Sequence, residues 1–258
     1  MTHVPKDLLD RLRATGQEHV LYRWEELAPF RREEFAAELA AIDFAELKTL
    51  VSQARESSPA PVANAIDPLP VEPAEATSSQ RGAGEDALRS GHVAALIVAG
   101  GQGSRLGFEK PKGMYPVGPV SGATLFEIHA EKILALSRRF GRPIPFLVMT
   151  SPATDADTRA DFAANRYFGL DPDQVIFFQQ GTMPAVCRET GRLLLEEPGK
   201  LFLSPNGHGG TLTALAERGV LRELDARGVK HVYYFQVDNP LLKICDPAFL
   251  GKHIEARS

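Results

Sequence analysis

A short apolar run, Ala94–Ala99, leads directly into a glycine-rich loop, and this junction constrains the fold more than any other stretch of the chain. The eight positions after the run contain four glycines: Gly100, Gly101, Gly103 and Gly107. A short run with β-branched members is typical of a strand buried on both faces. Clustered glycines let backbone N–H groups surround an anion, and Arg105 and Lys112 follow as positive charges. The junction predicts a phosphate-binding loop at the end of a buried strand.

Two familiar phosphate-binding loops do not match this stretch. The Walker A pattern requires a lysine and then a serine or threonine directly after its last glycine, and the chain has neither there. The dinucleotide fingerprint requires a third glycine at the position of Leu106, whereas Gly107 comes one residue later. The glycines by themselves are also compatible with a tight connection between a strand and a helix.

Apolar runs alternate with helical patterns through the rest of the chain. Further runs cover residues 144–149, 174–178 and 231–237, and helical patterns begin at Thr124, Asp155 and Thr211. This alternation predicts an α/β fold with a doubly wound, mostly parallel, Rossmann-like sheet. Ligands of such sheets bind at the carboxyl ends of the strands.

The composition divides the chain into three regions. Residues 1–56 have apolar residues at helical spacing and predict a small helical region. Residues 57–85 are rich in proline and alanine, which predicts an extended linker. Residues 86–258 contain the apolar runs and are expected to form the main domain.

The overall composition argues against several classes of function. A net charge of −4 does not fit a protein that binds nucleic acid. The two cysteines, Cys187 and Cys245, match no disulfide framework or metal-ligand spacing, which indicates a reducing compartment. Because the chain shows no signal-peptide pattern and no apolar run near about 18 residues, we expect a cytoplasmic protein that does not enter a membrane.

Three further motifs follow predicted strands. The side-chain amide of Gln180 offers a donor and an acceptor side by side, as the edge of uracil requires. Residues 204–211 form a second glycine-rich loop at the start of a helix, where anions are favoured. Asp238 follows the last apolar run, where a carboxylate opposite phosphate-binding cations can hold Mg²⁺. Each motif alone is also compatible with an ordinary turn.

In their order along the chain, these strings resemble the signature motifs of the UDP-sugar pyrophosphorylases. They are most similar to those of the eukaryotic-type UDP-N-acetylhexosamine pyrophosphorylases. The strings are Val98–Gly107, Lys110–Tyr115, Gln179–Ala185, Ser204–Thr211 and Gln236–Leu241. The resemblance implies a nucleotidyltransferase sheet of the GT-A type, with residues 86–258 as the nucleotide-binding catalytic domain, incomplete on its C-terminal side. It also implies a uridylyltransferase that converts UTP and a sugar 1-phosphate, foremost N-acetylglucosamine 1-phosphate, into a UDP-sugar and pyrophosphate.

The resemblance assigns roles to individual residues. It implies that Arg105 neutralises the leaving pyrophosphate, that Lys112 stabilises charge at the α-phosphate and that Asp238 binds Mg²⁺. The residues implied in UTP binding are Ala99, Gly100, Gly101, Gly103, Gln180, Pro205, Gly207 and His208. His208 stands at a variable position of the family's loop, which leaves glucose 1-phosphate as an alternative substrate.

Two other functions stay open at this point. A nicotinamide-dependent oxidoreductase would explain the glycine loop, but the second strand runs into Thr150-Ser151-Pro152 without the carboxylate that would bind a ribose. A non-catalytic UTP-binding module is the other alternative, because the motifs account only for the nucleotide side of the sheet. For the same reason we expect residues 1–258 by themselves to bind UTP weakly and not to turn it over.

Overall fold

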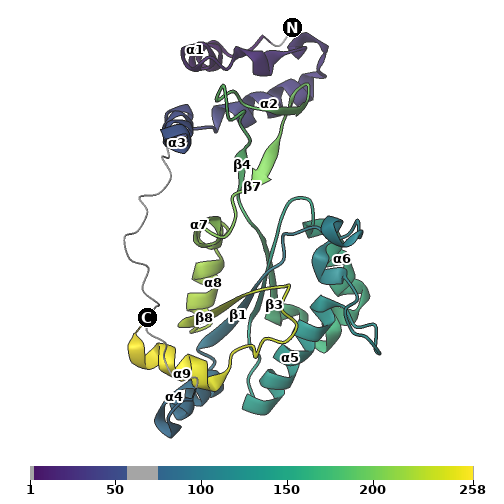
Figure 1. Ribbon diagram of the computed structural model, residues 1–258, viewed down its shortest axis with the longest axis vertical. Coiled ribbons are helices and arrows are strands. Elements are labelled where there is room, and N and C mark those ends of the chain that lie inside the picture. The colour runs from purple at the N-terminus through teal and green to yellow at the C-terminus, as the bar shows by residue number, and fades with distance from the viewer. Residues whose placement is uncertain (1–2, 57–74, 258) are drawn as a thin grey trace. The chain divides into compact units, whose positions relative to one another are not determined.

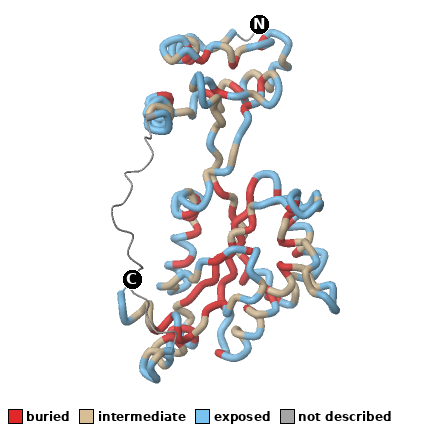
Figure 2. The backbone as a smooth tube through the Cα atoms, viewed as in Figure 1, coloured by how far each residue is buried: buried red, intermediate tan, exposed pale blue. Residues whose placement is uncertain are grey.

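The computed structural model describes residues 3–56 and 75–257, which divide into two compact units. The N-terminal unit combines residues 3–56 with Thr182–Ser204, and the sheet unit combines residues 75–181 with residues 205–257. Each unit has its own buried core (Figure 2). A segment from the middle of the chain thus belongs to the same unit as the beginning of the chain.

The sheet unit contains a four-stranded parallel sheet in the order β3–β2–β1–β8 (Figure 1). Its strands are β1 (Val93–Val98), β2 (Phe146–Thr150), β3 (Val175–Gln179) and β8 (His231–Gln236). The chain proceeds from β1 to β2 and β3 on one side and later adds β8 on the other side of β1. Ligands of parallel α/β sheets bind where the strand order reverses in this way, outside the carboxyl ends of the strands.

Helices cover both faces of this sheet (Figure 1). They are α4 (Ser78–Arg89), α5 (Leu125–Phe140), α6 (Asp155–Ala164), α7 (Gly210–Glu217), α8 (Val220–Ala226) and α9 (Pro247–Ala256). Ala95 and Ile97 of β1 share a core with α5 and α6, whereas Ala94 and Leu96 share a core with α7 and α8. Because alternate residues of a strand point to opposite faces, a sheet covered on both sides requires an unbroken apolar strand. The expected doubly wound parallel α/β fold is confirmed.

The structure differs from the expected linker, residues 57–85, at its C-terminal end. Residues 57–74 lie outside the described residues, but α4 begins within the expected linker. Thr77 and Gln80 cap α4 reciprocally, since each side chain accepts a hydrogen bond from the backbone N–H of the other residue. A β-carbon on Gly84 would lie 2.0 Å from a backbone oxygen of α9, so the two helices pack closely. This packing outweighs the poor helix propensity of glycine.

The N-terminal unit is built from helices and a strand-containing segment. The helices are α1 (Lys6–Thr15), α2 (Pro29–Ala40) and α3 (Phe44–Glu56), and the strands are β4 (Thr182–Pro184), β5 (Leu195–Glu197), β6 (Lys200–Leu201) and β7 (Leu203–Pro205). Its core joins Leu12, Phe35 and Leu39 of the helices to Leu193 and Leu201 of the segment. The sequence analysis placed this segment in the main domain, whereas in the structure it packs with the N-terminal helices.

Candidate functional site

The first glycine-rich loop folds back on itself at the carboxyl end of β1. The backbone N–H of Gly103 donates to the carbonyl of Lys110 at 2.9 Å, and that of Lys112 donates to the carbonyl of Gly101 at 3.0 Å. These two bonds return Lys112 to the end of the strand from which the loop starts. Arg105 is exposed on a short 3₁₀ turn and forms no hydrogen bond or ion pair with any residue that the structure describes. The loop therefore presents two cations beside exposed glycine backbone, as an anion site requires.

Lys112 forms an ion pair with Asp238, with Nζ 3.0 Å from Oδ2. The two residues are 126 positions apart. They meet because β1 and β8 are neighbouring parallel strands whose carboxyl ends lie at the same edge of the sheet. The side chains are 26% and 50% exposed, so solvent screens their attraction. The predicted catalytic lysine and the predicted metal ligand thus lie side by side.

Gln180 lies against the first glycine-rich loop. Its backbone N–H donates to the carbonyl of Thr150 at 2.9 Å, which continues the pairing of β2 and β3 beyond the end of β3. A β-carbon on Gly100 would lie 2.5 Å from Nε2 of Gln180, and the glutamine is buried. Glycine at this position leaves room for the amide. The predicted base-reading residue and the predicted phosphate loop are therefore in contact.

The second glycine-rich loop closes around Asn206, to which the sequence analysis gave no role. β-Carbons on Gly181 and Gly210 would lie 2.5 Å and 2.1 Å from Nδ2 of Asn206. Oδ1 of Asn206 is buried and has no hydrogen-bond partner among the described residues. Pro205 and Gly207, both predicted to bind UTP, flank the asparagine and are exposed. The asparagine side chain thus fills the space that the glycines leave inside the loop.

His208 is exposed and contacts β8. Its Nδ1 shares a hydrogen bond with the hydroxyl of Tyr234, and its Nε2 lies 3.5 Å from Nε2 of Gln236. Tyr234 and Gln236 are alternate residues of β8, so they lie on the same face of the sheet. The sequence analysis missed both contacts, and the two-residue period of the strand was the signal that could have revealed them.

The described residues can bind a magnesium ion through one carboxylate, provided that a bound ligand supplies further oxygen ligands. No three His, Cys, Asp or Glu side chains gather into a metal-binding group anywhere in the described part of the chain. Asp238 supplies a hard, half-exposed carboxylate at the carboxyl end of the sheet. Mg²⁺ in nucleotide enzymes is commonly bound by one or two carboxylates, with substrate phosphates and waters as the other ligands. Asp238 therefore suits a metal that arrives with a nucleotide, and this role stays a prediction.

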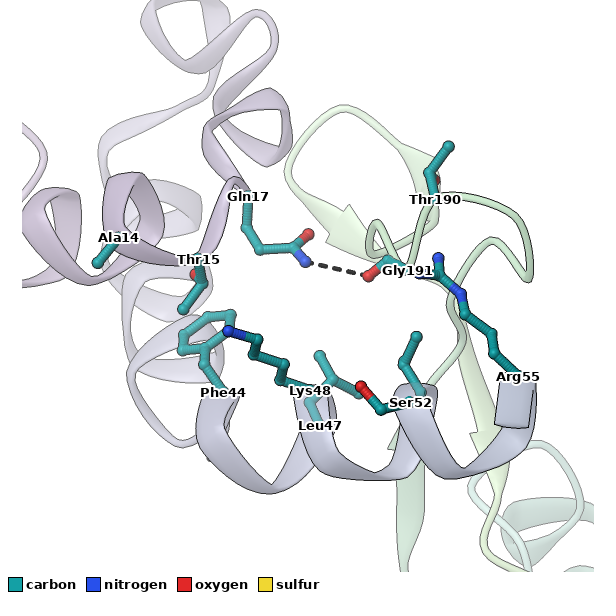
Figure 3. A pocket seen from close by; sticks show the side chains of 11 residues that line it. Ala14, Thr15, Gln17, Phe44, Leu47, Lys48, Ser52, Arg55, Thr190 and Gly191 are labelled. Carbon is teal, nitrogen blue, oxygen red and sulfur yellow. Dashed lines mark hydrogen bonds between the residues drawn. The ribbon is translucent and has the colours of Figure 1, made fainter. Parts of the chain in front are cut away.

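All predicted site residues lie in the sheet unit, and a separate pocket lies in the N-terminal unit (Figure 3). The pocket has a volume of about 250 Å³, and none of the predicted site residues lines it. Lys48 and Arg55 of α3 lie along one side, and the amide of Gln17 donates to the carbonyl of Gly191 at 3.1 Å on the other (Figure 3). This pocket is therefore not part of the candidate site, whose predicted residues all belong to the sheet unit.

Comparisons with known proteins agree with this fold. The sequence pattern of a family described as UTP–glucose-1-phosphate uridylyltransferase matches residues 43–258. UDP-N-acetylglucosamine diphosphorylase 2 of Arabidopsis thaliana is 38% identical over 269 residues, which cover 96% of this chain and 53% of the relative. UDP-N-acetylglucosamine pyrophosphorylase of Saccharomyces cerevisiae is 37% identical over 254 residues, which cover 92% of this chain and 53% of the relative.

A similar solved structure is that of the uridine diphosphate N-acetylglucosamine pyrophosphorylase from Trypanosoma brucei in complex with an inhibitor. It matches with a TM-score of 0.79 and 28% identity, over 100% of this chain and 56% of that chain. The chain spans about half the length of the curated relatives it matches.

Proposed function

Because the chain belongs to the UTP–glucose-1-phosphate uridylyltransferase family, we propose that this protein forms a UDP-sugar and pyrophosphate from UTP and a sugar 1-phosphate. The names of its relatives support N-acetylglucosamine 1-phosphate as the sugar substrate. The observation that carries the proposal is the meeting of Lys112, Asp238 and Gln180 with the first glycine-rich loop at the carboxyl ends of the strands. A nucleoside triphosphate with its metal needs four kinds of group. Backbone N–H groups and a cation bind its phosphates, a carboxylate binds its metal, and a fixed amide can recognise its base.

In the proposed reaction, a phosphate oxygen of the sugar 1-phosphate attacks the α-phosphorus of UTP. The bond from the α-phosphorus to the bridging oxygen breaks, and its electron pair leaves with pyrophosphate. Backbone N–H groups of Gly100 and Gly101 bind the phosphates, whereas the N–H of Gly103, also predicted to bind UTP, already donates to the carbonyl of Lys110 and shapes the loop. Arg105 neutralises the leaving pyrophosphate and Lys112 neutralises charge at the α-phosphate. Catalysis then depends on positioning and charge neutralisation, with little covalent chemistry by the protein.

Two further residues complete the proposal. Asp238 is the residue that would hold Mg²⁺, which supplies charge neutralisation on the phosphate oxygens when it is bound. The carbonyl oxygen and NH₂ group of Gln180 recognise N3–H and O4 of uracil. Recognition by buried hydrogen bonds discriminates strongly, because a different base leaves these groups unpaired.

Nucleotide affinities measured by calorimetry in the presence of Mg²⁺ test the proposal. In the protein at its natural length, UTP should bind far more tightly than ATP or CTP. Gln180→Ala should lower the affinity for UTP to that for ATP and leave the affinity for ATP unchanged, because the phosphate loop is intact. ATP binding is therefore the internal control for a misfolded variant. Equal affinities of the wild-type protein for UTP and ATP would refute the proposal.

A pyrophosphate-release assay with N-acetylglucosamine 1-phosphate or glucose 1-phosphate identifies the sugar. Glucose 1-phosphate is the second candidate because the matching family carries its name. Binding of UTP without release from either sugar phosphate would favour the non-catalytic binding module. Residues 1–258 by themselves should bind UTP weakly and release no pyrophosphate, because the predicted residues account only for the nucleotide side. Robust turnover by residues 1–258 would contradict that expectation.

The matched family and the relatives named above do not favour the oxidoreductase that the glycine loop left open. The described residues contain no helix with both the length and the apolar character that a membrane crossing requires. The cytoplasmic location and the absence of nucleic-acid partners stay predictions from the sequence.

A further inference from the structure

Helix α5 contacts both segments that carry the Lys112–Asp238 ion pair. Lys112 lies in the loop before α5, and Asp238 lies in the segment after β8, so the local sequence does not set the distance between them. Leu125, His129 and Lys132 are spaced at i, i+4 and i+7 and therefore lie along one face of α5. The first of these residues contacts the loop, and the other two contact the segment.

The segment after β8 is bound to α5 through its carbonyl oxygens. The fully buried ring of His129 donates from Nε2 to the carbonyl of Val237 at 3.0 Å. Nζ of Lys132 donates to the carbonyls of Pro240 and Leu242, the latter at 3.1 Å. The predicted metal-binding aspartate lies between these bonded carbonyls, so α5 fixes the main chain on both sides of it.

The loop that carries Lys112 rests on the first turn of the same helix. The backbone N–H of Leu125 donates to the carbonyl of Tyr115 at 3.2 Å. A β-carbon on Gly113 would lie 2.1 Å from the ring of Phe126, so the backbone next to Lys112 lies directly against that ring. One helix therefore supports both members of the ion pair.

Apolar packing anchors the segment at Val237 and Leu242 but not between them. Leu241 is 89% exposed, and half of the Asp238 side chain is exposed. Lys132 has no carboxylate partner within the described ranges, and burial lowers the pKa of its ammonium group. A partly buried charge costs free energy that an apolar side chain of similar size would not. Fold stability alone therefore accounts poorly for a lysine at this position.

We propose that His129 and Lys132 are positioning residues that hold Asp238 in register with Lys112. This inference rests on the proposed function, because it concerns the alignment of the proposed metal ligand with the proposed catalytic lysine. The hydrogen bonds from α5 fix the carbonyls of Val237 and Pro240 on either side of Asp238, which limits the motion of the main chain that carries the carboxylate. A pre-organised carboxylate binds a metal–nucleotide complex without first ordering its loop.

Hydrogen–deuterium exchange in the protein at its natural length measures the positioning without any ligand. In Lys132→Met, the amides of Leu241 and Leu242, both bonded to Asn239, should exchange about tenfold faster than in the wild type. Amides of α5 and β8 should be unchanged, which shows that the fold is intact. Lys132→Arg keeps a donor and should stay near the wild type. Arg138→Met removes an exposed positive charge from the same helix and is the matched control.

The Mg²⁺ concentration needed for half-maximal UTP binding is the second readout. Loss of a residue that orients a metal ligand commonly weakens metal binding 10–100-fold, so Lys132→Met should need about tenfold more Mg²⁺ than Arg138→Met. The affinity for UTP at saturating Mg²⁺ should be unchanged, and Lys132→Arg should restore most of the loss. His129→Phe keeps a ring but loses the donor, and it should shift the Mg²⁺ requirement in the same direction.

Each outcome decides the inference. If the amide exchange and the Mg²⁺ requirement of Lys132→Met both match those of Arg138→Met, the inference is wrong. Faster exchange with an unchanged Mg²⁺ requirement also overturns it, because Lys132 is then only structural. Absence of Mg²⁺-dependent UTP binding by the wild type refutes the proposed function and this inference with it, and that failure is recognised before any substitution is made.

Discussion

Lys112 and Asp238 neutralise each other's charge, with Nζ 3.0 Å from Oδ2. In the proposed reaction, however, the lysine contacts a phosphate and the carboxylate binds a metal cation. An ion pair between partly exposed side chains contributes about 0–1 kcal/mol to stability. Separating the two residues therefore costs little, and a metal–nucleotide complex offers each of them a stronger partner. The ion pair thus keeps both side chains at the carboxyl ends of β1 and β8, and it is weak enough to break when the ligand binds.

Replacing Lys112 by alanine should slow turnover far more than it weakens UTP binding. The lysine interacts most strongly with the charge that develops in the transition state, and losing one such contact commonly lowers kcat by about 10²–10³-fold. Pyrophosphate release measured against UTP concentration separates kcat from KM. Lys110→Ala, in the same loop, is the matched control. A normal kcat in Lys112→Ala would remove this residue from the mechanism.

His129 should make the free energy of unfolding depend on pH. Burial lowers its pKa below the ordinary 6.5, although the hydrogen bond with Val237 acts in the opposite direction. The unfolded chain therefore takes up a proton at a higher pH than the folded chain. At a pH where the imidazole of His129 is neutral in both the folded and the unfolded chain, it makes no contribution to the pH dependence. Stability falls as the pH drops below 6.5 toward the folded pKa, by up to about 1.4 kcal/mol per pH unit.

His129→Gln keeps a donor for the carbonyl of Val237 but cannot take up this proton. Its free energy of unfolding should therefore fall less steeply than that of the wild type as the medium is acidified. Urea unfolding near about pH 7.5 and about pH 5.5 measures the two slopes. Burial also lowers the pKa of His231, but this residue is present in both proteins and cancels in the comparison. Parallel slopes would contradict the assignment to His129.

At the scale of elements, the central strands β1 and β2 were predictable because burial on both faces demands continuous apolar runs. The run Ala94–Ala99 predicted β1, which the structure places at Val93–Val98. Helix α4 was not predicted, since its glycines and the prolines before it favour an extended chain. Thr77 and Gln80 carry the spacing of a capping box and were the signal for its start. The stability of α4 comes from its contact with α9, which no local pattern encodes.

Two glycines of α4 separate helix propensity from helix packing. A β-carbon on Gly82 meets nothing within 4 Å, whereas one on Gly84 would lie 2.0 Å from the carbonyl oxygen of Pro247. Gly82→Ala should raise the free energy of unfolding by about 0.5–1 kcal/mol, the usual helix-propensity gain. Gly84→Ala should lower it by about 1–3 kcal/mol, because the helices must move apart. Chemical denaturation compares them, and equal effects would show that α4 and α9 do not pack as described.

The sequence predicted individual candidate residues of the site, but it did not predict which of them contact one another. Residue type and position after a strand identified Lys112, Gln180 and Asp238, because charged and amide groups at strand ends suit a phosphate-bearing ligand. Their roles remain predictions. The ion pair across 126 positions and the contact of Gln180 with Gly100 depend on strand order, which the sequence pattern does not specify. For the same reason the sequence analysis missed Asn206, whose Oδ1 is buried, since the loop around it closes only in three dimensions.

At the scale of the whole molecule, the N-terminal unit requires two distant parts of the sequence. Leu193 and Leu201 are 1% and 4% exposed, and they share a core with residues of α1, α2 and α3. The hydrogen bonds of Gln17 to Gly191 and Leu193 join the same two parts. The periodicity of either part predicts its own helices or strands but not its partner, because non-local contacts leave no repeat in a single sequence.

Deleting residues 1–74 should therefore leave a chain that aggregates, although the deletion removes no strand of the four-stranded sheet. Without the N-terminal helices, Leu193 and Leu201 lose their cover, and burial of a leucine is worth about 1.5–3 kcal/mol. Exposed apolar side chains beside short strands favour association between chains. Sedimentation and thermal unfolding of residues 75–258 measure the effect. A monodisperse chain with one sharp transition would show that the segment folds without the N-terminal helices.

A second deletion distinguishes lost cover from a damaged sheet unit. It also removes residues 186–201 and joins Ala185 to Phe202 by an Asn-Gly turn, because the backbone N–H of Ala185 already donates to the carbonyl of Phe202 at 2.8 Å. This chain keeps the four-stranded sheet with helices on both faces and lacks the two uncovered leucines. It should stay monomeric and unfold in one transition, whereas the first deletion should not. If both chains aggregate alike, the fault lies in the sheet unit itself, and the division of the molecule into two independently packed cores is wrong.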